Sequence, residues 1–142
     1  MSKKELNWLR RLISWLSAKP PLPTPLELIE DGFAIIAEKG RIPVRWADVK
    51  EVFAFKRDIF SVDLICIGFR TSDEGHYFEI DEQMPGYDSV VAALPQAFPG
   101  FDDNWWCKVA YPPFKTCFCS MWGSQKMAGI WELGPKDLCK ER

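Results

Sequence analysis

The sequence lacks the short motifs that mark the common catalytic sites. It contains no P-loop, no G-x-G-x-x-G, no H-E-x-x-H and no G-x-S-x-G. Its only histidine, His76, follows the turn segment TSDEG, where no nucleophile and no orienting acid is fixed beside it. These absences predict a protein that is not an enzyme.

Long apolar runs are also missing. No run approaches the 18 residues that a membrane span needs, and Arg10 and Arg11 interrupt the N-terminal apolar stretch, which lacks a cleavage site. We therefore expect a cytoplasmic protein. The five cysteines are an odd number, which favours free thiols. Cys117 and Cys119 lack the knuckle spacing of a zinc site, so neither a metal nor another cofactor is predicted.

The net charge of −2 hides an uneven distribution of charge. Residues 58–103 hold ten acidic side chains against the single base Arg70. Such a segment repels phosphate, which argues against nucleic-acid binding, and it attracts a basic surface of another protein.

Alternation of apolar and polar residues from position 26 onward predicts short antiparallel strands in a meander, and therefore an α+β fold. Pro43 is compatible only with an edge strand or a bulge. A helix is expected near 86–98, followed by short strands near 107–110 and 116–122. The six main strands are expected at 26–30, 33–38, 41–46, 50–56, 62–70 and 76–81.

The strands VFAF and LICIGF are apolar on both faces, so they are expected to form a central hairpin that is covered on two sides. The opposing sheet would cover one face, and a helix or another subunit the other. The side chains predicted to be almost fully buried are Val52, Phe53, Phe55, Leu64, Ile65 and Ile67.

Residues 1–19 are predicted to form an amphipathic helix, followed by a proline-rich spacer at 20–25, a single globular domain at 26–134 and a charged tail at 135–142. The helix has two open interpretations. Its apolar face packs on the sheet or on a protein, or the helix lies on an anionic membrane. The residues for a membrane surface would be Trp8, Arg10, Arg11 and Trp15.

The stretch IPVRWADVKEVFAF, with Trp46, Asp48 and Val49, resembles bacterial pleckstrin-homology-like (PH-like) domains over about residues 26–98. The resemblance implies a PH-like barrel and a binding module more than an enzyme. A small α+β sandwich is the alternative fold.

On one strand face, Tyr77 would lie among the carboxylates of Glu79 and Asp81, which is an arrangement that interfaces favour. The first hypothesis is therefore a non-enzymatic protein-binding module for a basic partner, one form of which is an immunity-type inhibitor of a basic toxin. The second is a peripheral membrane adaptor held by the N-terminal helix. The predicted partner-binding residues are Asp73, Glu74, Tyr77, Glu79, Asp81, Glu82, Asp102 and Asp103.

Overall fold

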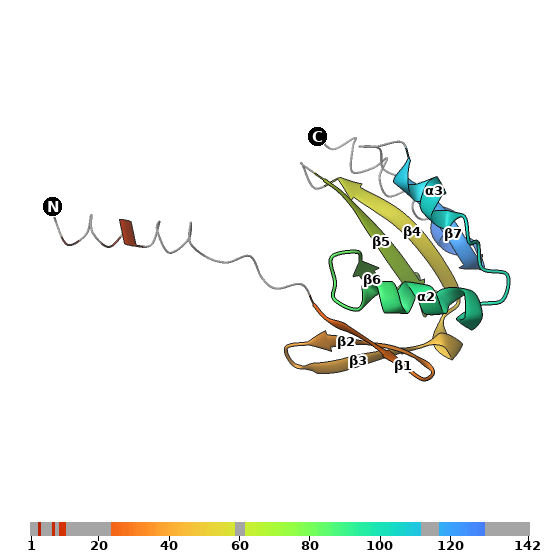
Figure 1. Ribbon diagram of the computed structural model, residues 1–142, viewed down its shortest axis with the longest axis horizontal. Coiled ribbons are helices and arrows are strands. Elements are labelled where there is room, and N and C mark those ends of the chain that lie inside the picture. The colour runs from red at the N-terminus through yellow and green to blue at the C-terminus, as the bar shows by residue number, and fades with distance from the viewer. Residues whose placement is uncertain are drawn as a thin grey trace.

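The computed structural model describes Lys3, Asn7, Leu9, Arg10 and residues 24–58, 62–111 and 117–129. The expected N-terminal helix lies outside the described residues except for those four isolated positions, and so do the spacer up to residue 23 and the charged tail. The described chain is α+β, as predicted (Figure 1). Its elements are β1 (Leu26–Ile29), β2 (Gly32–Ala37), β3 (Gly40–Arg45), a 3-10 turn (Trp46–Asp48), β4 (Glu51–Asp58), β5 (Asp63–Arg70), β6 (Tyr77–Asp81), α2 (Tyr87–Ala97), α3 (Trp105–Ala110) and β7 (Phe118–Gly123).

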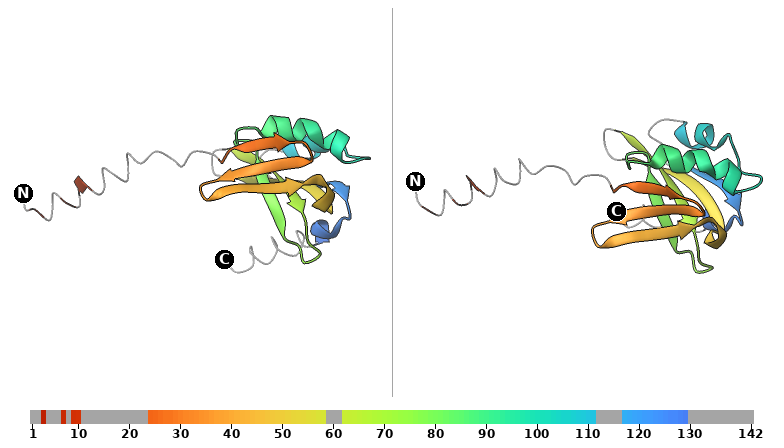
Figure 2. Two further views of the ribbon diagram at one scale, coloured as in Figure 1. Left: turned by 90° about the horizontal axis from the view of Figure 1, so that it is seen from below. Right: turned by 60° about the horizontal axis from the view of Figure 1, so that its bottom comes forward.

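The strands form two antiparallel sheets. The smaller has the order β1-β2-β3 and the larger the order β6-β5-β4-β7. Within each sheet the consecutive strands are joined as hairpins, which confirms the predicted meander, and β7 then pairs with β4. Figure 2 shows the strands of the smaller sheet running across those of the larger one.

Pro43 lies on the edge strand β3, as its missing amide hydrogen requires. The expected strand near 107–110 is wrong, because these residues belong to helix α3. Asp102 accepts a hydrogen bond from the Asn104 amide, which turns the chain just before the helix. Trp105 and Val109, the buried residues of α3, are four positions apart and therefore share a helix face.

The main core lies between the two sheets and includes α2 and α3, and a second cluster covers the other face of the large sheet. Phe53, Phe55 and Cys66 form this second cluster together with Met127, which follows β7. Both faces of the central hairpin are therefore buried, as predicted. Five of the six residues expected inside are at most 6% exposed. Leu64 is only half-buried, because it pairs with Arg57 near the turn end of the β4–β5 hairpin.

Candidate interaction surface

The eight acidic and aromatic residues predicted to bind a partner fall into two separate groups. Six surround β6: Asp73 and Glu74 precede it, Tyr77, Glu79 and Asp81 belong to it, and Glu82 follows it. Asp102 lies beside β7, because its amide donates to the Met121 carbonyl, and Asp103 follows it. Since β6 and β7 are opposite edges of the large sheet, the structure does not bring the two groups together.

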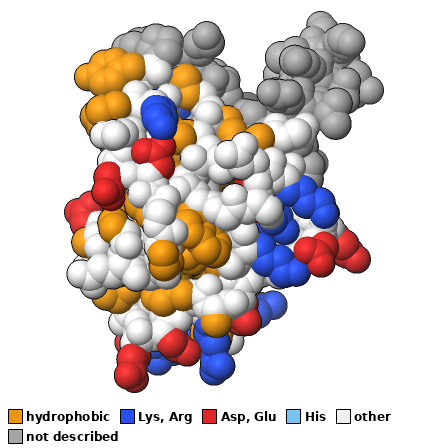
Figure 3. Space-filling model, turned by 90° about the vertical axis from the view of Figure 1, so that its right-hand side faces the viewer, with side chains coloured by type: hydrophobic (Ala, Val, Ile, Leu, Met, Phe, Trp, Pro, Cys, Tyr) orange, Lys and Arg blue, Asp and Glu red, His pale blue; other side chains and the backbone are white. Residues whose placement is uncertain are grey.

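Basic residues from outside the acidic segment neutralise part of it. Lys50 Nζ lies 2.9 Å from Asp73 Oδ1, and Arg57 Nη1 lies 2.7 Å from Glu79 Oε1. Lys108 pairs with Asp102 in the same way. The hydrogen bond from Lys50 holds the pKa of the Asp73 carboxyl below its ordinary value, and the hydrogen bond from Lys108 lowers the pKa of Asp102. Figure 3 shows acidic and basic side chains interspersed on the face it draws, with hydrophobic side chains gathered between them.

Once these ion pairs are taken into account, the most acidic part of the segment 58–103 is the side of β6 that carries Tyr77, Glu79 and Asp81. Among the described residues, neither Asp81 nor Glu82 takes part in an ion pair. Asp81 instead accepts the Gln83 amide, and Glu82 accepts the Ile65 amide. Within the part of the chain that the structure describes, the one ion-pair partner of Glu74 is His76, at 3.3 Å, and this is an ion pair only when the imidazole is protonated. This cluster is therefore a net negative surface.

Tyr77 is positioned by the second hydrophobic cluster. Its ring meets the ring of Phe53 edge-on, with centroids 5.1 Å apart, and 37% of the residue stays exposed. Burial raises the pKa of its hydroxyl above the ordinary value, with the Glu79 charge as a second cause. An aromatic that is anchored on one side and exposed on the other is a typical interface residue.

The main chain of β6 has hydrogen-bonding groups that point away from β5. At the two ends of the β5–β6 pair, the Thr71 amide donates to the His76 carbonyl, and the Glu82 amide donates to the Ile65 carbonyl. Because ladder bonds alternate, the even-numbered residues of β6 face β5, whereas Tyr77, Glu79 and Asp81 face outward. The Asp81 carbonyl is taken by the Met84 amide. No described residue bonds to the outward amide or carbonyl of Tyr77 or Glu79.

The other three sheet edges are blocked. On β1, the outward amide of Leu26 donates to the Pro85 carbonyl, and α2 packs beside the strand. On β3, the Trp46 amide donates to the Asp31 carbonyl, so the even-numbered residues bond to β2 and Pro43 occupies an outward position. Pro43 has no amide hydrogen to offer there. On β7, the Met121 carbonyl accepts the Asp102 amide, and α3 covers the strand. An unpaired edge is a template for another strand, and most edges are protected in such ways.

A groove of about 500 Å³ lies beside the open edge. It separates β3 from the start of β6 and has both apolar and charged walls. Its lining residues are Pro43, Val44, Arg45, Ala47, Asp48, Lys50, Thr71 and Phe78. A second groove, of about 440 Å³, lies between β1 and α2 and includes Trp46 and Leu28.

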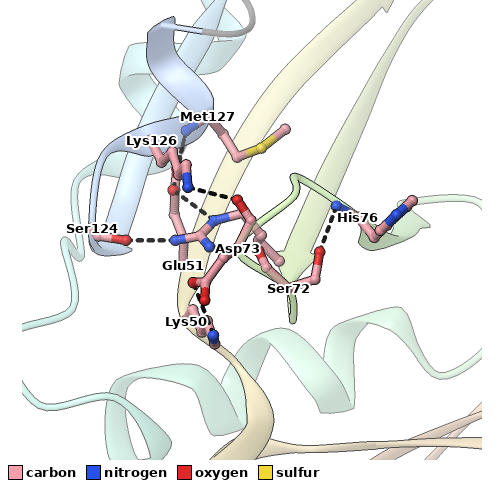
Figure 4. A network of polar contacts seen from close by, with 9 residues as sticks. Lys50, Glu51, Ser72, Asp73, His76, Ser124, Lys126 and Met127 are labelled. Atoms are coloured by element: carbon pink, nitrogen blue, oxygen red, sulfur yellow. Dashed lines mark hydrogen bonds and ion pairs between the residues drawn. The ribbon is translucent and has the colours of Figure 1, made fainter.

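A buried polar network fixes the turn that leads into β6 (Figure 4). Glu51 and Arg70 are at most 1% exposed and form an ion pair of 3.2 Å. Both Glu51 oxygens also accept the Met127 amide, and Arg70 donates to the Ser72 carbonyl and the Ser124 hydroxyl. These bonds tie β4, β5 and the chain after β7 together, so the network serves the fold. The sequence signal for this network was a charged residue, Glu51 in β4 and Arg70 in β5, in step with the apolar residues of one strand face.

The residues considered for chemistry are dispersed. His76 is exposed, Cys66 and Cys119 are buried, and Cys107 is exposed on α3. Within the described ranges, no group of three potential metal ligands occurs and no helix is long and apolar enough to cross a bilayer. Trp106 and Tyr111 are exposed aromatic residues whose rings meet edge-on beside α3.

Compared with known proteins, the chain matches no family model, no curated protein and no solved structure. The resemblance to PH-like domains therefore stays a prediction.

Proposed function

We propose that this chain is a non-enzymatic protein-binding module whose partner contacts β6 through Tyr77, Glu79 and Asp81. The observation that carries the proposal is the open edge of β6, which lies beside an anchored, half-exposed aromatic and a net negative cluster. Affinity would come from Tyr77 and the main chain, and partner choice from the carboxylates. A partner with a basic surface fits this chemistry.

Asp102 and Asp103 lie at the opposite edge of the sheet and are not part of this proposed surface. An immunity-type inhibitor of a basic toxin is one protein of the proposed class, and a PH-like barrel is a fold that would suit it. The alternative is a peripheral membrane adaptor. It depends on Arg10 and on Trp8, Arg11 and Trp15, of which the last three lie outside the described residues.

The test is affinity capture from native lysate with three proteins. They are the wild type, the double reversal Glu79→Lys with Asp81→Lys, and the charge-matched control Glu30→Lys with Glu38→Lys. The control changes two exposed acids in the hairpin turns of the smaller sheet. We expect the wild type and the control to enrich the same basic protein and the β6 variant to lose it.

Association rates at two salt concentrations complete the test, because electrostatic steering weakens as salt rises. The proposal fails if the β6 variant captures the same protein at the same, salt-independent rate. Circular dichroism of the variants separates lost binding from lost folding.

A further inference from the structure

We propose that β6 binds its partner by strand addition, and that the partner segment is extended and antiparallel, with basic and small apolar residues in alternation. This inference rests on the proposed function and adds the mode of binding and the chemical class of the bound segment.

The first argument is the direction of the main-chain groups. The outward amides and carbonyls of Tyr77 and Glu79 and the outward amide of Asp81 have the spacing of a sheet ladder, because they belong to every second residue of a regular strand. An added antiparallel strand would form hydrogen-bonded pairs with these three residues. The buried Glu51–Arg70 network holds the turn before β6, so the edge is already in strand conformation.

The second argument concerns the side chains of an added strand. Residues directly opposite in an antiparallel pair point to the same face of the sheet. Side chains opposite Tyr77, Glu79 and Asp81 would therefore lie in the net negative cluster, which favours lysine or arginine. The intervening side chains would lie on the face of Phe78, next to the groove whose apolar wall includes Pro43 and Val44. Small apolar residues suit that side.

A second copy of this chain is a poorer occupant. An antiparallel pair of two β6 strands that uses the whole strand is centred on Glu79, so the two Glu79 carboxylates would lie opposite each other. Asp81 and Glu82 add further negative charge on both copies. Like charges directly opposite destabilise a strand pair, whereas opposite charges stabilise it.

The experiment leaves the protein unchanged and varies the probe. The probe is a capped heptapeptide of alternating lysine and valine, beginning and ending with lysine. Its binding to the full chain is measured from NMR shifts of the Tyr77–Asp81 amides. Two further versions carry N-methyl groups, one on the lysines and the other on the valines. N-methylation removes a donor and blocks close approach without changing the charge.

In the proposed arrangement the lysine amides donate to β6, and the valine amides point away from it. We therefore expect the lysine-methylated peptide to bind at least about tenfold more weakly than the parent, and the valine-methylated peptide to keep the parent affinity. Equal weakening by both methylations, no effect of either, or no parent binding at millimolar concentration would overturn strand addition in this form. Stronger loss for the valine-methylated peptide would also overturn it, since a parallel strand bonds through the other residues.

Sedimentation of the free protein tests whether a second copy of the chain occupies the β6 edge. We expect a monomer over the concentrations used for NMR, and a dimer whose contacts map to β6 would overturn the assignment to a basic segment. The outcomes separate the two proposals. If capture depends on Glu79 and Asp81 while the methylation pattern has no effect, protein binding stands and strand addition falls.

Discussion

The Arg57 guanidinium contacts the Glu79 carboxylate at 2.7 Å, although the two residues lie on strands that are not neighbours in the sheet. Between them runs β5, which presents Cys66 and Gly68 on this face, and the guanidinium passes over the ring of Phe55. Small side chains on the central strand leave the space for this contact.

Replacing Glu79 with Gln should therefore lower the free energy of unfolding by up to about 1 kcal/mol, as for a partly exposed ion pair. The measurement is urea denaturation at low and high salt, in a double-mutant cycle with Arg57→Gln. A coupling free energy of zero between the two substitutions at low salt would contradict the stabilising role of this pair.

The buried pair Glu51–Arg70 should behave differently. Glu51→Ala leaves the Arg70 charge uncompensated in the interior and removes the acceptor of the Met127 amide, so we expect a loss of about 3–5 kcal/mol. Lys50→Ala is the control, because Lys50 belongs to an exposed pair with Asp73 and should cost at most about 1 kcal/mol. Equal effects of the two changes would show that the network does not stabilise the fold.

Gly68 is required by the packing of Phe53. A Cβ atom at this position would lie 2.2 Å from the Phe53 ring, which stacks against the rings of both Phe55 and Phe118. Gly68→Ala should therefore destabilise the protein by about 1–3 kcal/mol in thermal or urea unfolding. The control is Gly129→Ala, where no atom of the described residues other than its chain neighbours lies within 4 Å of the new methyl group. Wild-type stability of the Gly68 variant would refute this packing.

The thiols should differ in reactivity. Burial raises the pKa of Cys66 to about 12, helped by the charge of Glu79, whereas Cys107 is exposed. At pH 8 we expect iodoacetamide to modify Cys107 at least about a hundredfold faster than Cys66, because the thiolate is the reactive form. Peptide mapping by mass spectrometry gives both rates, and equal rates would contradict the burial of Cys66.

The same shift predicts a pH dependence of stability. Below about pH 9 the Cys66 thiol is neutral in both the folded and the unfolded chain. Between about pH 9 and 12 the unfolded chain loses this proton while the folded chain keeps it, so stability falls as the pH rises. Cys66→Ala should reduce this fall in denaturation curves recorded across that range. A fall of the same size in wild type and variant would assign the effect to other groups.

The strands and α2 were predictable because their signals are local. Alternation of apolar and polar residues predicted the strands, and the helix expected near 86–98 corresponds to α2 at Tyr87–Ala97. Pro43 indicated the edge strand correctly. The helix at Trp105 was missed, because a six-residue segment with two buried positions fits either period.

The charge pairing was not predictable, because it depends on sheet order and on the length of side chains that cross a strand. The acidic count of residues 58–103 ignored Lys50, Arg57 and Lys108, which lie outside that segment. The direction of the Tyr77 and Glu79 main-chain groups likewise required the β5–β6 register.

Amide hydrogen exchange at β6 tests the central claim most directly. In the free protein, the amides of Tyr77 and Glu79 should exchange much faster than those of Phe78 and Ile80, which bond to β5. Adding the protein that the wild type captures should slow exchange at Tyr77 and Glu79 by about tenfold or more. Unchanged exchange at both amides in the saturated complex would contradict the account, because the partner would then bind elsewhere.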